Sequence, residues 1–299
     1  MHLFCSTIIP TINRPTLSRA VNSVLSQELT GGALEVIVVN DSGAVLPTSD
    51  WQHSPRVTVL HTNRHERSVA RNVGAAVAKG RYLHFLDDDD VLLPGALKAV
   101  ERLAKEAEEA WLYGAYQTVD NEGTVVAQFR PGLTGDIFAL LVAGESIPLQ
   151  ASLIRSDEFF RIGGFGTDPA ILGVEDRDLG RRLALRGTVA YTPAMVASIR
   201  IGEQGSTTKW DTLAENDRLG RERALSDPAA YRRIRQSASS DYWRGRVARA
   251  YLASTAWNLK RRRLLTGLTR AAAAGRVSAP RIATPTFWRG LRTRAGGDA

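Results

Sequence analysis

The first two-thirds of the chain alternates between short apolar segments and longer segments with helical spacing. Residues 17–25 and 68–78 place apolar side chains at steps of three and four, as amphipathic helices do. The apolar segments are rich in β-branched residues and cover residues 4–9, 35–39, 57–61 and 82–86. We predict an α/β fold with a mainly parallel central sheet, because strands with nearly continuous hydrophobicity are buried on both faces. Short helices then form right-handed crossovers between the strands.

The regular alternation ends near residue 110. Residues 111–129 predict a hairpin that turns at Asn121-Glu122-Gly123, and a region punctuated by Gly and Pro follows as far as Pro148. A helix over 175–186 and strands over 188–191 and 196–201 complete the predicted domain.

After a polar segment the composition becomes rich in Arg and Ala, and its spacing is helical. We therefore expect one domain over residues 1–208 and a basic, mainly helical extension over 209–299. Within that extension, a largely apolar stripe at helical steps carries a tryptophan at each end and consists of Trp243, Val247, Ala250, Tyr251, Ser254 and Trp257.

The charge is divided unevenly along the chain. Residues 1–217 carry 20 Lys and Arg against 27 Asp and Glu, whereas residues 218–299 carry 19 against 4, and the net charge is +8. Two interpretations of the basic extension stay open: its stripe packs on the first domain, or its cations bind an anionic membrane surface. No nucleic-acid recognition motif accompanies the charge, so we expect no nucleic acid partner.

Other features of the sequence limit where the protein works. No segment approaches the ~20 consecutive apolar residues of a membrane-spanning helix, and the N-terminus lacks the pattern of a signal peptide. The single cysteine, Cys5, lies in an apolar segment and is expected to be a small buried side chain. We expect a cytoplasmic protein, either free or held peripherally on the inner face of the membrane.

Four aspartates, Asp87–Asp90, directly follow a predicted buried strand. In an extended segment Asp87 and Asp89 point to the same side, and such oxygen donors suit Mg²⁺ or Mn²⁺ shared with substrate phosphates. The alternative is a solvated acidic turn in which Asp88 or Asp90 caps the next helix. We favour the metal site, because ligands in open α/β sheets bind beyond the carboxyl ends of the strands.

Three further positions carry candidate chemistry. Asp41 follows a predicted strand and suits a contact to a base or ribose, or it is a turn residue. Glu175 and Asp176 begin a predicted helix. Acids at this position either cap the helix, where the helix dipole stabilises their charge, or supply a general base. Arg71 lies early in a helix, where it could hold phosphate oxygens or be an ordinary surface arginine.

In this order, the segments resemble the family 2 glycosyltransferases of the GT-A fold, a Rossmann-like sandwich, over about residues 3–208. The resemblance rests on Thr7-Ile8-Ile9-Pro10-Thr11-Ile12-Asn13-Arg14, Val38-Val39-Asn40-Asp41-Ser42, Ala70-Arg71-Asn72-Val73-Gly74, Phe85-Leu86-Asp87-Asp88-Asp89-Asp90 and Glu175-Asp176.

The resemblance implies roles for these residues. Asp176 would be the catalytic base, with Glu175 as the second candidate, and Asp87 and Asp89 would bind Mn²⁺ or Mg²⁺. The nucleotide-sugar donor would be bound by Pro10, Thr11, Asn13, Arg14, Asp41, Arg71, Asp87 and Asp88. The chain departs from the family pattern at Asn40, where many members have aspartate, and in residues 200–206, which lack a metal-binding histidine. Water or Glu203 would then complete the metal shell.

Two functions follow as hypotheses. The first is a metal-dependent inverting glycosyltransferase that moves a sugar from a nucleoside diphosphate sugar, a UDP-sugar by default, to a hydroxyl of a glycan or lipid-linked acceptor. The second is a non-catalytic protein that keeps the fold for nucleotide-sugar binding or membrane assembly. The presence of Asp87, Asp89 and Asp176 favours the enzyme.

Overall fold

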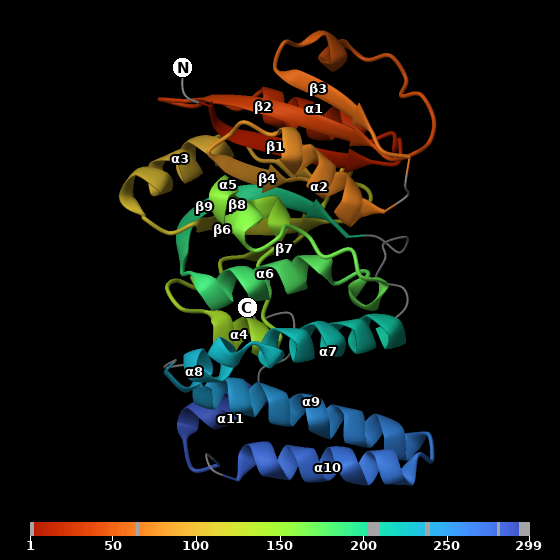
Figure 1. Ribbon diagram of the computed structural model, residues 1–299, viewed down its shortest axis with the longest axis vertical. Helices are drawn as coiled ribbons and strands as arrows, with labels where there is room; N and C mark the ends of the chain where they lie inside the picture. The colour runs from red at the N-terminus through yellow and green to blue at the C-terminus, as the bar shows by residue number, and fades with distance from the viewer. Residues whose placement is uncertain (1–2, 64–65, 202–209, 237–239, 280–281, 293–299) are drawn as a thin grey trace. The chain divides into compact units, whose positions relative to one another are not determined.

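The computed structural model describes residues 3–63, 66–201, 210–236, 240–279 and 282–292, which form two compact units (Figure 1). The sheet unit comprises Met1–Gly135 and Ile147–Gly220, and the helical unit comprises Asp136–Ser146 and Arg221–Ala299. Helix α7 (Trp210–Ser226) begins in the first unit and ends in the second. The domain boundary between residues 208 and 209 stays a prediction.

One half of the central sheet is parallel and matches the four predicted strands. Its strands lie in the order β3-β2-β1-β4, and all neighbouring pairs are parallel. They are β1 (Leu3–Thr11), β2 (Ala33–Asn40), β3 (Val57–His61) and β4 (Tyr82–Phe85). Because all four run the same way, their carboxyl ends meet at one edge of the sheet.

The other half of the sheet mixes parallel and antiparallel pairs. The sheet continues from β4 through β8, β6 and β9 to β5, and β7 pairs with β6 in the predicted hairpin. These strands are β5 (Val91–Leu92), β6 (Trp111–Val119), β7 (Val125–Phe129), β8 (Ser152–Arg155) and β9 (Val189–Arg200). The two strands predicted within 188–201 are one strand, β9, whose register against β6 shifts at Gly114 and Ala115.

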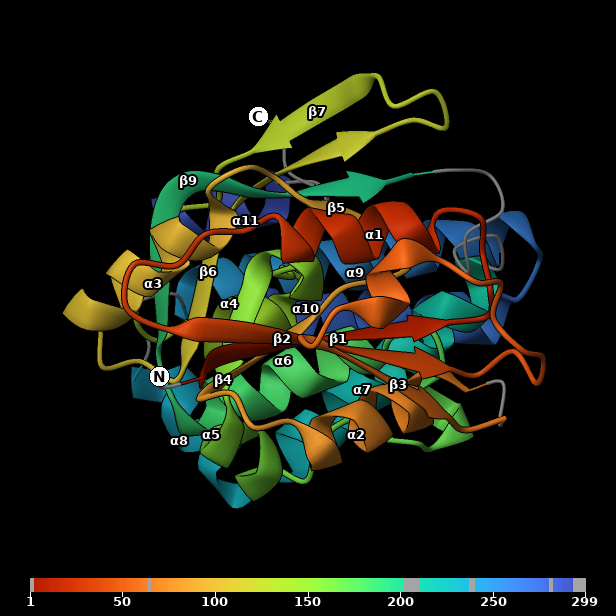
Figure 2. The same cartoon turned by 90° about the horizontal axis from the view of Figure 1, so that it is seen from above.

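Helices cover both faces of the parallel half, with α1 (Leu17–Leu25) on one face and α2 (Arg67–Val77) on the other (Figure 2). The remaining helices of the sheet unit are α3 (Ala96–Glu106), α5 (Ser156–Arg161) and α6 (Glu175–Arg186), with 3₁₀ turns η1 (Asp50–His53), η2 (Leu149–Ala151) and η3 (Pro169–Ile171). Helix α6 spans the residues predicted for it. The α/β class is therefore confirmed.

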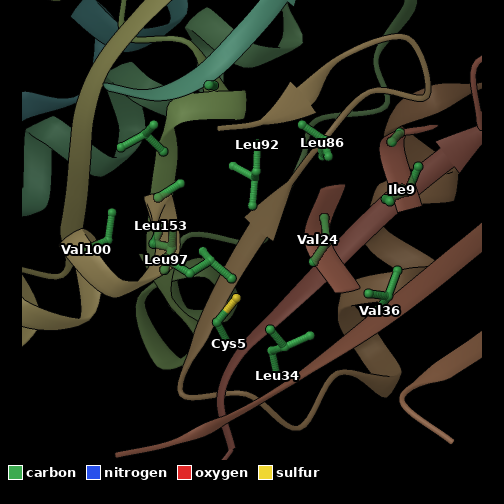
Figure 3. Packing of buried hydrophobic residues seen from close by; sticks show 14 of the residues in the cluster. Cys5, Ile9, Val24, Leu34, Val36, Leu86, Leu92, Leu97, Val100 and Leu153 are labelled. Carbon is green, nitrogen blue, oxygen red and sulfur yellow. The ribbon is translucent and has the colours of Figure 1, made fainter. Parts of the chain in front are cut away.

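The main core lies where α1 and α3 pack on the sheet. Figure 3 shows Ile9, Val24, Leu97 and Leu153, from β1, α1, α3 and β8, gathered in this cluster. Cys5 is fully buried among them, as predicted. Burial of this apolar surface is the main driving force that fixes the strand ends on which the site is built.

On the opposite face, α2 approaches the sheet unusually closely. A Cβ atom at Gly74 would lie 2.5 Å from the Ile8 side chain and 3.0 Å from that of Val39. A glycine is therefore required here for close packing, and it brings the polar residues of α2 near the strand ends.

The helical unit is built around its longest helix, α9 (Ser240–Lys260), against which α10 (Leu264–Ser278) and α11 (Pro285–Arg292) pack (Figure 1). It also contains α4 (Phe138–Ala143) and α8 (Pro228–Gln236). Glu145, which follows α4, accepts a hydrogen bond from Tyr242 at 2.9 Å and lies 3.4 Å from Arg246 of α9. Within the described residues, no helix has the length and apolar character needed to cross a bilayer.

Candidate active site

The four aspartates Asp87–Asp90, called here the aspartate run, lie at the carboxyl end of β4, and their side chains differ in exposure to solvent. The side chains of Asp87 and Asp89 are 28% and 31% exposed, whereas Asp88 and Asp90 are buried. The first pair is partly exposed to solvent, although Asp87 also contacts Arg71 and Gln150, and the second pair is buried. This division fits the metal site predicted at Asp87 and Asp89, which stays a prediction.

Asp88 connects the aspartate run to the loop that follows β1. It accepts a hydrogen bond of 2.6 Å from the Thr11 hydroxyl and one of 2.6 Å from Arg14 Nη1. Arg14 Nη1 also lies 3.4 Å from Asp89. Asn13 has a left-handed backbone (φ 69°), and its NH donates to Thr11 Oγ1 at 2.9 Å. Four of the predicted donor-binding residues, Pro10, Thr11, Asn13 and Arg14, therefore belong to β1 or to the loop that Asp88 anchors.

Asp90 anchors the end of β9. Its Oδ1 accepts the backbone NH of Arg200 at 2.7 Å. Burial, reinforced by the charge of Asp87, raises the pKa of Asp90 well above its ordinary value. Helix α3 is capped by Gly95 (φ 77°), so neither Asp88 nor Asp90 serves as the helix cap considered as the alternative.

A buried arginine joins the aspartate run to the start of α6. Arg71 is 3% exposed, and its guanidinium lies 2.6 Å from Asp87 Oδ1 and 3.3 Å from Glu175 Oε1. Burial alone would raise the pKa of Asp87, but the charge and hydrogen bond of Arg71 outweigh it and hold that pKa below its ordinary value. Asp87 is thereby kept ionised, which is the state in which a carboxylate binds a metal cation.

Four residues in α2 and at its N-cap each contact a different part of the sheet unit. Arg71 faces the carboxylates, while Asn72 exchanges two hydrogen bonds of 2.9 Å with the backbone of Phe165. Gly74 allows the helix to approach β1 and β2. Glu66 caps the helix by accepting from the NH groups of Ser68 and Val69. The motif Ala70-Arg71-Asn72-Val73-Gly74 thus combines a residue of the candidate site, Arg71, with two residues that pack the helix, Asn72 and Gly74.

The two acids at the start of α6 differ in their surroundings. Glu175 is buried, and its Oε1 also lies 3.0 Å from Arg67 Nε, so two arginines share one oxygen. Asp176 is half-buried, and among the described residues its carboxylate accepts one hydrogen bond, from the NH of Arg177 at 2.8 Å. Within the part of the chain that the structure describes, Asp176 is therefore the acid of this pair that forms no ion pair with an arginine.

Asp41 lies at the end of β2 and is buried. Its Oδ1 accepts from the Thr62 hydroxyl at 2.7 Å, and its Oδ2 accepts from the NH of Glu66 at 2.6 Å. Asn40 holds the turn that follows, through a hydrogen bond of 2.6 Å to the carbonyl of Ala44. Both residues therefore have the structural role considered as the alternative, and the contact of Asp41 with a nucleotide base stays a prediction.

The sequence did not indicate two residues of the site, Arg67 and Gln150. Arg67 lies one helical turn before Arg71, so the i, i+4 spacing could have indicated it. Gln150 donates to Asp87 Oδ2 at 2.9 Å from the 3₁₀ turn η2, for which the sequence gives no signal.

His84 supports that turn from β4. The carbonyl of Gln150 can only accept, so His84 Nε2 carries the proton in this 3.0 Å bond, and Nδ1 accepts from the Thr7 hydroxyl at 3.1 Å. Burial lowers the pKa of His84 to about 4, so the ring is neutral at pH 7.

The residues present fit a divalent ion that arrives with a diphosphate. No group of three or more His, Cys, Asp or Glu side chains suited to a metal occurs in the described part of the chain. Mg²⁺ is commonly bound by one or two carboxylates together with substrate phosphates, and the accessible oxygens of Asp87 and Asp89 meet that requirement. Glu203, the other ligand considered, lies outside the described residues.

Comparison with known proteins identifies the family of the chain. The family model for glycosyl transferase family 2 matches residues 6–161. The uncharacterized glycosyltransferase YwdF of Bacillus subtilis (strain 168) is 35% identical over 239 residues, covering 74% of this chain and 85% of that protein.

Other relatives share a smaller part of their length. An uncharacterized glycosyltransferase of Haemophilus influenzae is 30% identical over 192 residues, covering 63% of this chain and 64% of that protein. The poly(ribitol-phosphate) beta-N-acetylglucosaminyltransferase TarP of Staphylococcus aureus is 33% identical over 117 residues, covering 37% of this chain and 36% of that protein. The chain thus spans less than two-thirds of the length of these two relatives.

Among solved structures, S. aureus TarS 1–349 in complex with UDP-GlcNAc superposes with a TM-score of 0.62 at 14% identity, covering 92% of each chain. This likeness confirms the predicted GT-A fold. Together with the match of the family model over more than half of the sequence, it shows that the chain belongs to glycosyl transferase family 2.

Proposed function

We propose that the chain transfers a sugar from a nucleoside diphosphate sugar to a hydroxyl acceptor, with inversion at the anomeric carbon. One observation supports this proposal: buried Arg71 links Asp87 to Glu175, the residue directly before Asp176, and among the described residues the Asp176 carboxylate makes no ion pair with an arginine. The two requirements of the reaction, binding of the diphosphate charge and acceptance of a proton, would then be met by neighbouring groups.

Asp87 and Asp89 would hold Mn²⁺ or Mg²⁺, which when bound neutralises negative charge on the departing diphosphate. Arg71 keeps Asp87 ionised and oriented, and Gln150 fixes its second oxygen. Arg14, which is about half exposed and already lies next to Asp89, supplies a cation at the same edge for the donor phosphates.

Asp176 would act as the general base. As the acceptor oxygen bonds to the anomeric carbon, the bond from that carbon to the diphosphate oxygen breaks, and Asp176 takes the hydroxyl proton. Glu175 is the weaker candidate, because two arginines already share its Oε1. We assign Glu175 a positioning role through Arg71 and Arg67.

The relatives guide the choice of donor and acceptor. A TarS structure contains UDP-GlcNAc, TarP is named for N-acetylglucosaminyl transfer to poly(ribitol phosphate), and ExoO of Rhizobium meliloti is named for succinoglycan biosynthesis. We therefore propose a UDP-sugar donor, with UDP-GlcNAc as the first to test, and a glycan or lipid-linked acceptor of the cell surface.

The proposal is tested by thermal stability with a panel of nucleoside diphosphates, each with and without Mn²⁺. A ligand that binds only the folded state raises the melting temperature by mass action, and we expect the largest rise for UDP with Mn²⁺ together. Equal melting temperatures with and without every nucleotide would contradict it.

The metal site is tested by calorimetry of UDP binding in the presence of Mn²⁺. Asp89→Ala should weaken binding, because it removes one of the two accessible carboxylates. Glu122→Ala, at the exposed tip of the β6–β7 hairpin, is the matched control and should bind as the wild type does. Unchanged affinity in Asp89→Ala would remove this residue from the metal site.

A further inference from the structure

The connection between α9 and α10 places large apolar and cationic side chains together in solvent. Leu264, Leu265 and Leu268 are 62%, 82% and 63% exposed. The four residues before them, Lys260-Arg261-Arg262-Arg263, are all exposed. We call residues 260–268 the leucine–arginine tip.

The cations of the tip have no acidic residue near them in the sequence. Between Asp241 and Asp298 the chain contains neither Asp nor Glu. Instead, the guanidinium of Arg261 lies 3.7 Å from the centre of the Trp257 ring, and that of Arg263 lies 5.4 Å from it. Stacking on an indole orients the arginines and leaves their charge uncompensated.

The fold itself does not require these residue types. Arg262 has a left-handed backbone (φ 57°), where glycine or asparagine is favoured. Arg263 is the N-cap of α10 and makes no side-chain capping bond, and cations at this end oppose the helix dipole. A polar turn with Gly and Ser would make a more stable helical connection, so the tip points to an interaction outside the chain.

The residues predicted to form the apolar stripe lie elsewhere. Val247 is buried, and Trp243, Tyr251, Ser254 and Trp257 are half-buried. Ala250, the remaining member of the predicted stripe, is exposed. The large side chains of that stripe are therefore mostly covered, and among the described residues of the helical unit the most exposed large apolar side chains are those of the tip.

We propose that the leucine–arginine tip docks the protein on an anionic lipid surface. The three leucines would enter the boundary between headgroups and acyl chains, while Lys260 and the three arginines contact lipid phosphates. A nucleic acid would match the cations but not the adjacent leucines. In a symmetric contact with a second copy, each cation cluster would face the other, which is unfavourable.

The proposal does not depend on the reaction that the sheet unit catalyses. Docking through the tip would hold the enzyme beside acceptors that are attached to lipid. Each cation near an anionic leaflet contributes enough to change partitioning about fivefold, so the effect of the tip is measurable residue by residue.

The test is flotation of the full chain with phosphatidylcholine vesicles, with and without about 30 mol% phosphatidylglycerol. We expect binding to the anionic vesicles only, with loss at high salt. Arg262→Asn combined with Arg263→Gln should weaken this binding about 25-fold, because each cation contributes about fivefold. The charge-matched control, Arg232→Gln with Arg235→Gln on exposed positions of α8, should weaken it no more than about threefold.

A second variant separates the leucines from the charge. Leu264→Ser, Leu265→Ser and Leu268→Ser together should weaken vesicle binding about tenfold or more, with the salt dependence and the melting temperature unchanged. Several results would overturn the proposal: absence of binding, equal binding to neutral and anionic vesicles, or equal losses in the tip and α8 variants. Light scattering that shows this variant to be a monomer and the wild type an oligomer, with equal vesicle binding, would instead identify a contact between copies.

Discussion

Replacing Arg71 by methionine removes the cation that two carboxylates share. The arginine side chain is 4% exposed, and its guanidinium lies 2.6 Å from Asp87 and 3.3 Å from Glu175. Removing one partner of a buried ion pair costs about 3–5 kcal/mol, because an uncompensated charge stays buried. In the variant, Glu175 keeps its contact with Arg67 at 3.0 Å, and Asp87 keeps its hydrogen bond with Gln150 at 2.9 Å. Because both carboxylates keep a partner, we expect the free energy of unfolding to fall by about 3 kcal/mol, the lower end of this range.

Urea denaturation at pH 7 without ligands measures this loss. Arg67→Met is the matched control, because Arg67 lies one turn earlier in α2, contacts the same Glu175 oxygen and is 38% exposed. A partly exposed pair contributes about 1 kcal/mol or less, so Arg67→Met should be the milder change. Adding Glu175→Gln to Arg71→Met should restore at least about 1 kcal/mol by removing one unpaired charge. If Arg71→Met lowers the free energy of unfolding no more than Arg67→Met does, the buried ion pairs of Arg71 do not stabilise the site.

Two further predictions concern buried positions. Because the pKa of His84 falls from 6.5 to about 4 on folding, the unfolded chain binds its proton first, and stability should fall as the pH drops from 6.5 towards 4. Urea midpoints at pH 7 and pH 5 should change less in His84→Gln than in the wild type, and parallel profiles would contradict this. Gly74→Ala should cost about 1–3 kcal/mol by urea denaturation, because its Cβ would lie 2.5 Å from Ile8. Gly275→Ala, which faces open space in α10, should be neutral or stabilising, and equal costs would argue against close packing at Gly74.

The elements of the fold that could be predicted are those marked by a pattern within a short stretch of sequence. The four parallel strands, the β6–β7 hairpin and α6 each follow from hydrophobic periodicity or a turn signal within a few residues. Strand β8 has only four residues, and it is a strand because it pairs with β4 and β6. No local sequence pattern therefore predicts it. The division of 188–201 into two strands was wrong, because pairing with β6 carries β9 through Pro193.

In the candidate site too, local patterns predicted some residues, and contacts distant in sequence determined the rest. The aspartate run and the start of α6 were visible because acids beside apolar segments stand out in a sequence. Their division into buried anchors, Asp88 and Asp90, and accessible acids, Asp87 and Asp89, depends on partners 74 to 110 residues away along the chain. Gln150 reaches Asp87 through tertiary packing alone, and a lone glutamine in a Gly- and Pro-rich region gives no sequence signal.

The most direct measurement compares donor binding with turnover in Asp176→Asn. The substitution preserves the shape of the side chain and removes its ability to accept a proton. With UDP-GlcNAc, Mn²⁺ and water as the acceptor, we expect UDP release to fall by at least about a hundredfold while calorimetry gives an unchanged donor affinity. Asp157→Asn, at an exposed acid of α5, is the control and should release UDP at the wild-type rate. UDP release by Asp176→Asn at the wild-type rate would contradict the assignment of Asp176 as the catalytic base.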